Sequence, residues 1–378
     1  MSEWDVLVIG AGQAGLAAAY YLEQQHITYR VLEAGERIGH QWRARYEGLR
    51  LLTPARYCSL PGMPFPAPPY AFPTKDEVAD YLERYARRFR LRVLTGQRVL
   101  RMRRGAEDSF EVITEQQSWS ARNVIVATGA YAVPRVPEWA SDLDPELWQI
   151  HSQTYRNPDQ VPGEPVLVVG GGNSGIAIAE ELSRTRLVYW SCDRPLWQAP
   201  ERIFGIPVHW WAWTLGLNRM SVHAWPGRWL RRLNEPVSGV NLKELLARPT
   251  LRLVSRVVGV RDGGRAIELA DGRLLSGIQA LIWATGYRIC FPWIELPVFD
   301  ASGQPQHLRG VSVEPGLYFL GLPWLHSRGS ALIGGVGRDA RYVVEHIRRY
   351  RLRSGSSGRF WSGAIAPLRS LFRMATAG

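Results

Sequence analysis

The chain has 378 residues, of which 46% are hydrophobic and 21% are charged. This length allows two domains with a large buried core, and the composition excludes disordered and fibrous classes of protein. No run of eighteen apolar residues is present, so no membrane span is expected. The first residues lack the basic stretch and cleavage site of a signal peptide, which predicts a cytoplasmic protein.

The formal net charge of +12 raises the question of a nucleic-acid or membrane-surface patch. Only Lys75 and Lys243 are lysines, so arginine supplies nearly all of the positive charge, and it is spread along the whole chain. We interpret this as a compositional bias and expect no nucleic-acid partner. The three cysteines stand singly, without a Cys-x-x-Cys pair, so neither a disulfide-exchanging pair nor a metal site is predicted.

In chain order, the first predicted element is a buried strand over 6–9, followed by Gly-x-Gly-x-x-Gly at 10–15. A helical pattern over 16–25 and a strand over 29–33 come next. A strand, a glycine turn, a helix and a second strand form the context in which this motif binds a dinucleotide.

Each residue of this motif has a physical task. Gly10 permits the tight turn, Gly12 lets the backbone approach a pyrophosphate, and Gly15 lets the helix pack closely on the strand. The N-terminus of the helix offers N–H groups and partial positive charge to the phosphates. Glu33, at the end of the second strand, is placed to accept both ribose hydroxyls.

The same pattern returns later in the chain, with a strand over 166–169, glycines in 170–175, a helix over 176–184 and a strand over 187–191. A second dinucleotide site is therefore expected. No carboxylate stands at the end of its second strand, and Asp193 and Arg194 follow just beyond. A missing acid beside an arginine favours the 2′-phosphate of NADPH, while Asp193 leaves NADH open. Arg202 is a weaker candidate for the phosphate.

A second repeat brackets this unit. Residues 123–129 and 280–286 are both buried-strand patterns that end in Ala-Thr-Gly, and a proline-rich crossover over 131–137 follows the first. A glycine at the carboxyl end of a parallel strand allows close contact between backbone and ligand. We expect an α/β fold in which a nicotinamide domain is inserted into the first domain. The expected divisions are 1–155 and 285–352 for the first domain, 156–284 for the inserted domain, and 353–378 for a flexible or docked tail.

Several motifs resemble those of class B flavin-dependent monooxygenases, and especially YUCCA-type enzymes and their bacterial relatives. They are Gly-Ala-Gly-Gln-Ala-Gly-Leu at 10–16, Gly39-x-x-Trp42, Leu49 to Pro54, Tyr57 to Pro66, and Trp-Ala-Thr-Gly-Tyr at 283–287. The family's identifying sequence, Phe-x-Gly-x-x-x-His-x-x-x-Phe/Tyr/Trp, is matched at His151 and Tyr155, whereas Pro145 and Leu147 replace its Phe and Gly. We expect His151 to help hold the two domains in register and not to act as a base.

The resemblance implies tightly bound FAD at the first loop, NADPH as reductant and dioxygen as co-substrate. It implies a flavin C4a-hydroperoxide that passes one oxygen to a small molecule, either a soft nucleophile or a carbonyl compound. Two alternatives stay open: an NAD(P)H-dependent flavin reductase or oxidase without oxygen insertion, and a redox- or nucleotide-sensing flavoprotein linked to ion transport. A homodimer is also open.

The predicted site falls into two groups of residues. No catalytic residue is assigned, and the candidates near the flavin are Thr53, Cys58, His326 and Arg328. The residues predicted to bind cofactor are Gly10, Gly12, Gln13, Ala14, Gly15, Glu33, Gln41, Trp42, Thr53, Ala127, Thr128, Gly129, Gly170, Gly172, Asn173, Ser174, Gly175, Arg194, Thr285 and Gly286.

The segment 204–233 carries five tryptophans among basic residues. We expect it to pack within the inserted domain, with a roof over a substrate channel or a subunit contact as alternatives.

Overall fold

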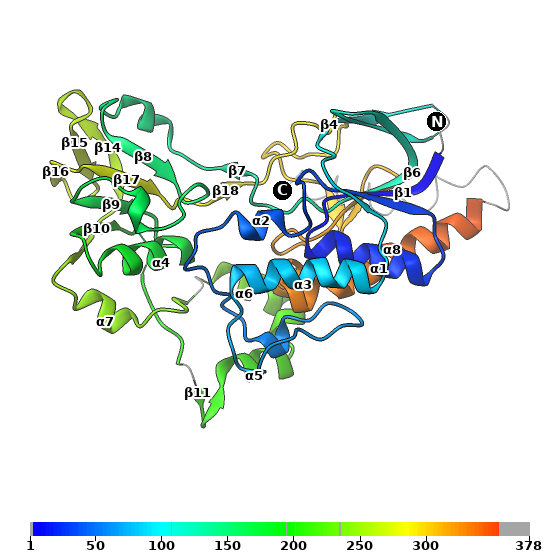
Figure 1. The fold of residues 1–378 in the computed structure, drawn as a ribbon, viewed down its shortest axis with the longest axis horizontal. Coiled ribbons are helices and arrows are strands. Elements are labelled where there is room, and N and C mark those ends of the chain that lie inside the picture. The colour runs from blue at the N-terminus through cyan, green and yellow to red at the C-terminus, as the bar shows by residue number, and fades with distance from the viewer. Residues whose placement is uncertain (1–2, 107, 194, 201, 234–235, 355–378) are drawn as a thin grey trace.

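The computed structural model of the chain describes residues 3–106, 108–193, 195–200, 202–233 and 236–354. Figure 1 shows two lobes, each built around its own sheet, with a narrow connection between them. This arrangement confirms the predicted α/β fold of two dinucleotide-binding units, the second inserted into the first.

The first lobe is built on a sheet of order β19-β20-β21-β6-β1-β2-β3, whose central strands from β21 to β3 are parallel. A meander of β4 and β5 pairs with β6 in antiparallel fashion. The strands are β1 (Glu3–Ile9), β2 (Tyr29–Leu32), β3 (Val93–Leu94), β4 (Val99–Arg104), β5 (Phe110–Thr114), β6 (Ser118–Val126), β19 (His307–Leu308), β20 (Val311–Ser312) and β21 (Leu317–Phe319).

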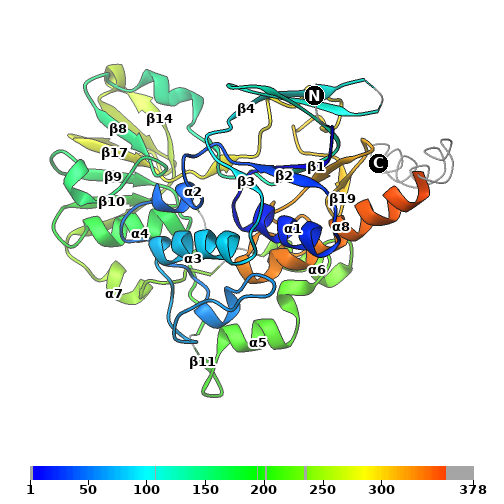
Figure 2. The same cartoon turned by 45° about the vertical axis from the view of Figure 1, so that its right-hand side comes forward.

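Helices α1 (Gln13–Gln24), α3 (Lys75–Arg88) and α8 (Ile333–Ser354) cover one face of this sheet, as Figure 2 shows. Alternate residues of β1 point to opposite faces, so Val6 and Val8 pack against these helices while Leu7 and Ile9 face the other side. Helix α3 begins at a capping box in which Thr74 and Glu77 satisfy each other's backbone N–H groups.

The second lobe contains a five-stranded sheet of order β13-β10-β9-β17-β8, parallel throughout. Its strands β9 and β17 are buried along their whole length, which explains their unbroken apolar sequence. Its elements are β8 (Trp148–His151), β9 (Val166–Val169), α4 (Asn173–Leu182), β10 (Val188–Ser191), α7 (Leu242–Leu246), β13 (Leu251–Val254), β14 (Val257–Arg261), β15 (Ala266–Leu269), β16 (Leu274–Ser276) and β17 (Ala280–Trp283).

The lobes are joined by two extended segments that run side by side. Strand β7 (Val133–Pro134) pairs with β18 (Tyr287–Arg288), so the outgoing and returning chains form one short antiparallel ladder. Because β8 already belongs to the second sheet, the chain enters the second lobe before Trp148, earlier than the expected division at residue 155. Strand β8, in which only His151 is buried, was hidden in sequence by its short, mixed pattern.

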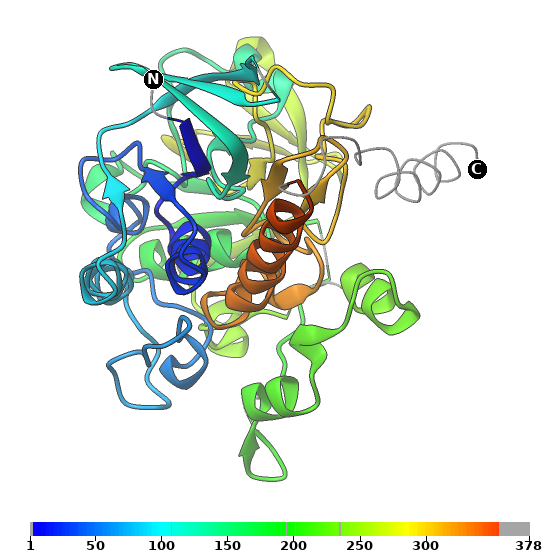
Figure 3. The same ribbon diagram turned by 90° about the vertical axis from the view of Figure 1, so that its right-hand side faces the viewer.

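The tryptophan-rich segment does not pack within the inserted domain, and that expectation is wrong. It extends as an arm, defined here as residues 202–233, and returns to the first lobe (Figure 3). Trp213 stacks on Tyr57 with ring centroids 5.4 Å apart, and the Val222 N–H donates to the carbonyl oxygen of His326 at 2.8 Å. The arm contains β11 (Arg202–Ile203), β12 (Ile206–Pro207), α5 (Val208–Thr214), the 3-10 turn η4 (Leu217–Arg219) and α6 (Trp225–Arg232).

Candidate functional site

The first glycine loop has no room for larger residues at two of its three glycines. Gly10 has φ +103°, and a Cβ there would lie 2.8 Å from the carbonyl oxygen of Ala127. A Cβ on Gly15 would lie 1.9 Å from the carbonyl oxygen of Gly10. Among the described residues, nothing lies within 4 Å of a Cβ added at Gly12 and no side chain caps α1, so the N-terminus of α1 offers space that a phosphate fits.

Glu33 is fixed beside this loop. One of its carboxylate oxygens accepts the N–H of Ala11 at 2.7 Å and the other accepts the N–H of Gly35 at 2.9 Å. The half-buried carboxylate is thereby anchored at the carboxyl end of β2. Each oxygen retains a second acceptor site, which a ribose hydroxyl can use.

The second glycine loop repeats this geometry. Gly170 has φ +132°, and a Cβ there would lie 2.2 Å from the carbonyl oxygen of Ala284. A Cβ on Gly175 would lie 2.0 Å from the carbonyl oxygen of Gly170, whereas Gly172 again faces open space. Helix α4 also lacks a side-chain cap, and its first residue, Asn173, carries a buried Oδ1 atom with no partner among the described residues.

The two Ala-Thr-Gly sequences explain part of this likeness. In each lobe the alanine provides the backbone oxygen against which the loop's first glycine packs, Ala127 in one and Ala284 in the other. The closing glycines, Gly129 and Gly286, have φ +75° and +81°, and each turns the chain away from its strand. Thr128 is exposed, and the Thr285 hydroxyl donates to the carbonyl oxygen of Arg135.

The loops differ at the end of their second strands. The register pairs Ile9 with Leu32 in the first sheet and Val169 with Ser191 in the second, so Cys192 occupies the place of Glu33. The N–H groups of both residues donate to the neighbouring strand in the same way. The carboxylate is therefore absent from the second loop, as predicted. Arg194 lies outside the described residues, and Arg202 lies on the hairpin of the arm, which projects from the second sheet.

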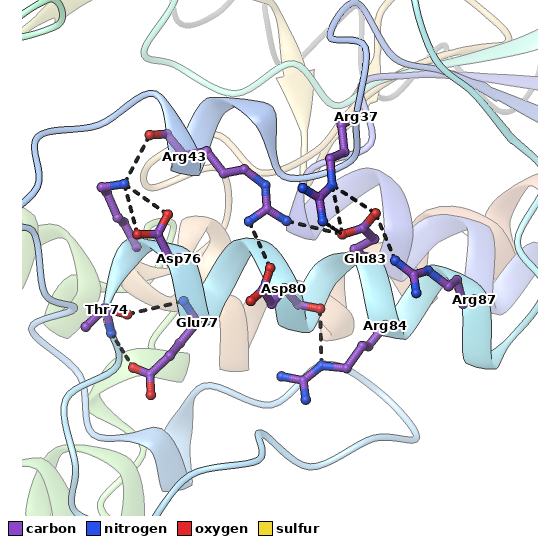
Figure 4. A network of polar contacts seen from close by, with 10 residues as sticks. Arg37, Arg43, Thr74, Asp76, Glu77, Asp80, Glu83, Arg84 and Arg87 are labelled. Atoms are coloured by element: carbon purple, nitrogen blue, oxygen red, sulfur yellow. Dashed lines mark hydrogen bonds and ion pairs between the residues drawn. The ribbon is translucent and has the colours of Figure 1, made fainter.

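Gln41 and Trp42 lie on the short helix α2 (His40–Arg43), which begins at Gly39 in the left-handed region. Figure 4 shows the polar network that fixes this segment to α3. Arg43 pairs with Asp80 at 2.8 Å and with Glu83 at 3.2 Å, and Arg37 pairs with Glu83 at 2.7 Å. The hydrogen bond from Arg37 lowers the pKa of Glu83 to about 2. The network positions α2 without using Gln41 or Trp42.

Thr53 and Cys58 frame the 3-10 turn η1 (Ala55–Tyr57). The Cys58 thiol donates to the carbonyl oxygens of Thr53 and Pro54, each at 3.3 Å, and burial raises its pKa to about 12. A protonated, enclosed thiol supports the turn and is a poor nucleophile. This geometry argues against Cys58 as a catalytic residue, whereas Thr53 is half-buried.

The segment that carries His326 and Arg328 lies beside the first glycine loop. Gln13 donates to the carbonyl oxygen of Ala331 at 3.4 Å, and a Cβ on Gly321 would lie 2.7 Å from that of Ala14. Arg328 begins the turn η6 (Arg328–Ala331), directly before α8. His326 has a buried Nδ1 atom with no partner among the described residues, and burial is the main cause that lowers its pKa.

Sequence reasoning missed one cluster, which lies at the connection between the lobes. Arg45 donates to the Tyr287 hydroxyl at 2.7 Å and its guanidinium lies within 6 Å of the Tyr131 and Tyr287 rings, at 5.7 and 5.5 Å. The two rings meet edge to face at 5.4 Å. Tyr287 was visible in sequence as part of a motif, but Arg45 follows α2 without a pattern that marks it.

His151 joins this cluster from the second sheet. Its Nδ1 atom accepts the N–H of Gln153 at 3.1 Å, so a neutral ring donates from Nε2 to the carbonyl oxygen of Gly286 at 3.0 Å. Burial lowers its pKa, which keeps the ring neutral. The predicted position of His151 at the domain junction agrees with these contacts.

Three further observations concern the described residues as a whole. No group of three or more His, Cys, Asp or Glu side chains in the described ranges could hold a metal ion. None of the helices described is both long and apolar enough to cross a membrane. Within these ranges, Cys58, Cys192 and Cys290 are not joined in disulfides.

Comparison with known proteins places this geometry in a family. A family model described as pyridine nucleotide-disulphide oxidoreductase matches residues 7–208. An uncharacterized CzcO-like oxidoreductase of Geobacillus kaustophilus (strain HTA426) is 42% identical over 344 residues, which cover 91% of this chain and 98% of the relative. A probable indole-3-pyruvate monooxygenase of Arabidopsis thaliana, YUCCA9, is 30% identical over 341 residues and 79% of each chain.

A solved structure agrees with the sequence relatives. The flavin-containing monooxygenase from Stenotrophomonas maltophilia is 29% identical, with a TM-score of 0.78, and the match covers 93% of this chain and 100% of that one. The chain therefore belongs to the class B flavin-dependent monooxygenases, flavoprotein oxidoreductases that depend on a flavin and a pyridine nucleotide.

Proposed function

We propose that the protein is an NADPH-consuming monooxygenase that uses FAD to insert one atom of dioxygen into a small soft nucleophile or carbonyl compound. The observation that carries this proposal is the meeting of the two Ala-Thr-Gly ends. Tyr131 follows the first and Tyr287 follows the second, and their rings are in contact. The two cofactor loops therefore open toward one junction, where hydride transfer needs them.

FAD fits the first loop. Gly10, Gly12 and Gly15 would admit the pyrophosphate, the backbone N–H groups of Gln13 and Ala14 would bind it, and Glu33 would hold the ribose. Gln41, Trp42 and Thr53, which follow β2 in the chain, and Ala127, Thr128 and Gly129 at the carboxyl end of β6 would complete the site. When bound, the flavin accepts hydride and supplies the oxygen chemistry.

NADPH fits the second loop. Gly170, Gly172 and Gly175 repeat the pyrophosphate cradle, and Asn173 and Ser174 open α4 where a phosphate would lie. The unpartnered Oδ1 of Asn173 offers an acceptor to a donor on the nucleotide. Thr285 and Gly286 form the adjoining strand end. We assign the 2′-phosphate to Arg194, so Arg194→Ala should weaken NADPH binding and leave NADH binding nearly unchanged; an equal loss for both nucleotides would refute this assignment.

The chain's own residues would orient the reactants and exclude water. Arg45 holds Tyr287 across the junction, and neutral His151 fixes the backbone of Gly286, so the nicotinamide loop is kept in register with the first lobe. Trp213 and Tyr57 stack beside the start of α8, where a Cβ added at Gly334 would lie 3.3 Å from the Trp213 ring and would collide with the carbonyl oxygen of Tyr57. Aromatic cover at this point would limit water, which diverts oxygen chemistry toward peroxide.

Stopped-flow spectroscopy tests the proposal. The FAD-bound protein is reduced with NADPH and mixed with oxygen, with NADP⁺ present or removed. A monooxygenase should show a near-ultraviolet transient that persists with NADP⁺ before the oxidised spectrum returns. Immediate reoxidation with stoichiometric peroxide would identify an oxidase, and slow or absent reduction by NADPH would identify a sensor. Either result would refute the proposal.

A further inference from the structure

The arm, residues 202–233, has a composition unlike the rest of the chain. It contains five arginines and five tryptophans but no aspartate or glutamate. Elsewhere, arginines are commonly matched by carboxylates, as in the pairs on α3 and on the β4–β5 meander. The positive charge of this segment is therefore not neutralised from within it.

Helix α6 turns this composition into a defined surface. Trp225, Trp229 and Leu233 follow one another at intervals of four residues, which places them in one stripe along the helix. These three residues are 74%, 59% and 43% exposed, respectively. Arg228 and Arg232 lie along the same side of the stripe at helical spacing, and both are exposed.

The arginines of α6 are not engaged in ion pairs with the described part of the chain. Arg228, Arg231 and Arg232 are all exposed, and no salt bridge to any of them occurs among the described residues. Arg231 lies on the opposite side of the helix, whereas Arg228 and Arg232 flank the stripe. A surface that combines these two cations with large apolar side chains matches a partner that has anionic groups next to an apolar phase.

The helix is held firmly enough to present this surface. Gly227 packs against the backbone of Ser221, where any Cβ would lie 2.0 Å from a carbonyl oxygen. The next residue, Val222, is hydrogen-bonded to His326 of the first lobe, and Arg338 of α8 donates to the carbonyl oxygen of Asn218 at 3.5 Å. The stripe therefore faces outward from an arm that is attached at its inner side.

Two occupants from this chain itself are disfavoured by charge. The C-terminal segment 355–378, which lies outside the described residues, contains Arg359, Arg369 and Arg373 and no acid. A two-fold contact between copies would set the arginines of one stripe against those of the other without a carboxylate from either arm. Both would bring like charges together.

We propose that the arm docks on an anionic lipid surface, with Trp225 and Trp229 in the interfacial layer and Arg228 and Arg232 on lipid phosphates. Tryptophan prefers this depth because its ring is apolar and its N–H is polar, and arginine extends its charged end back to the headgroups. Leu233 favours lipid over nucleic acid because it has no ring to stack on a base. Phe204, at the tip of the β11–β12 hairpin of the same arm, is 92% exposed and adds a further apolar side chain to the surface.

Vesicle flotation with the full FAD-bound chain tests this inference. Vesicles of phosphatidylcholine with about one third phosphatidylglycerol should bind the protein, pure phosphatidylcholine vesicles should not, and added salt should weaken binding. A basic residue near an anionic surface contributes roughly fivefold to binding, so R228Q/R232Q should weaken it by roughly 25-fold. The charge-matched control R88Q/R348Q removes one exposed arginine from α3 and one from α8 and should change binding by less than about threefold.

The apolar contribution has its own variant. W225S/W229S keeps every charge and should also weaken vesicle binding strongly, with the FAD spectrum unchanged as evidence of folding. Equal loss in the charge-matched control, loss of binding only on removal of 355–378, or dimerisation through the stripe would overturn the proposal. So would tighter binding to a single-stranded oligonucleotide than to the anionic vesicles. NADPH-dependent flavin reduction in solution is measured separately and does not enter these outcomes.

Discussion

The two glycine loops have nearly the same geometry. Gly10 and Gly170 both take a positive φ and both lie against the alanine oxygen of an Ala-Thr-Gly strand end. At the end of the second strand the units diverge, with anchored Glu33 in one and Cys192 in the other. Close packing requires glycines in the loop that binds the pyrophosphate. The residue beside the ribose decides which nucleotide the loop accepts.

The loop glycines are therefore constrained by the fold, whereas the residue at the end of the second strand is constrained by the nucleotide that binds. A residue other than glycine at Gly10 or Gly170 would collide with backbone in either lobe, whatever the cofactor. Glu33 and Cys192 are instead half-buried and lie directly after the last residues of β2 and β10. The predictions below test that separation.

The largest effects are expected from alanine at the first glycine of each loop. Gly10→Ala should reduce FAD affinity by roughly 100-fold or more, because a left-handed alanine is strained by about 1–3 kcal/mol and its Cβ also meets Ala127. Gly170→Ala should retain FAD but lose reduction by NADPH to a similar degree. Flavin content and stopped-flow reduction measure the two losses.

The control for these variants is Gly277→Ala. Gly277 also has a positive φ, at +74°, but nothing lies within 4 Å of its Cβ position. It carries the backbone strain without the contact and without a cofactor loop, so it should keep both FAD and reduction. Loss of both functions in all three variants would show that general instability, and not the loops, is being measured.

Somewhat smaller effects are expected at the divergent positions. Glu33→Gln should weaken FAD binding by about tenfold or more, since a hydrogen bond to a charged group contributes about 1.5–3 kcal/mol. Cys192→Glu should raise the KM for NADPH by roughly tenfold through repulsion of the 2′-phosphate, with NADH unaffected or improved. Steady-state kinetics with both nucleotides checks this; a parallel change for NADPH and NADH would mean that Cys192 does not lie at the ribose.

A more modest effect is expected where the lobes meet. Tyr287→Phe keeps the ring contacts with Tyr131 and His151 but removes the acceptor for Arg45. Flavin reduction should slow by roughly five- to tenfold because the nicotinamide loop is less well positioned, while FAD affinity stays unchanged. Arg45→Lys should behave alike, since an ammonium cannot lie flat between two rings. An unchanged reduction rate in both variants would remove the positioning role.

Much of this architecture could be predicted from sequence, because it rests on short-range rules. The strands before each glycine loop, the helices after them and the inserted topology follow from apolar runs, glycine spacing and the repeated Ala-Thr-Gly. The structure differs from the expected division at residue 155 because, among the described strands, β8 pairs with β17, more than a hundred residues later in the chain. No local pattern reveals such a partner.

The rest of the site depends on contacts between distant segments. Tryptophans in 204–233 indicated burial within their own domain, but Trp213 finds Tyr57 and the first lobe instead. Cys58 lies in a motif expected near the flavin, yet its thiol is enclosed by the turn that it supports. Arg45 is recognised as part of the junction only from its contacts with the Tyr131 and Tyr287 rings in the structure.

The smallest expected effect concerns how each region responds to acid. Burial lowers the pKa of His307, on β19 of the first sheet, to about 4, and it also lowers that of His151 in the second. In the unfolded chain His307 becomes protonated below its ordinary pKa of 6.5, whereas in the folded protein it stays neutral down to about pH 4. Stability is therefore present above pH 6.5 and is lost as the pH falls toward 4. His307→Asn keeps an acceptor for the Gly310 N–H without titrating, so its thermal midpoint should fall less steeply across this window. His151→Gln should flatten the curve by less; if it flattens the curve more, the junction and not the first lobe is the acid-sensitive region.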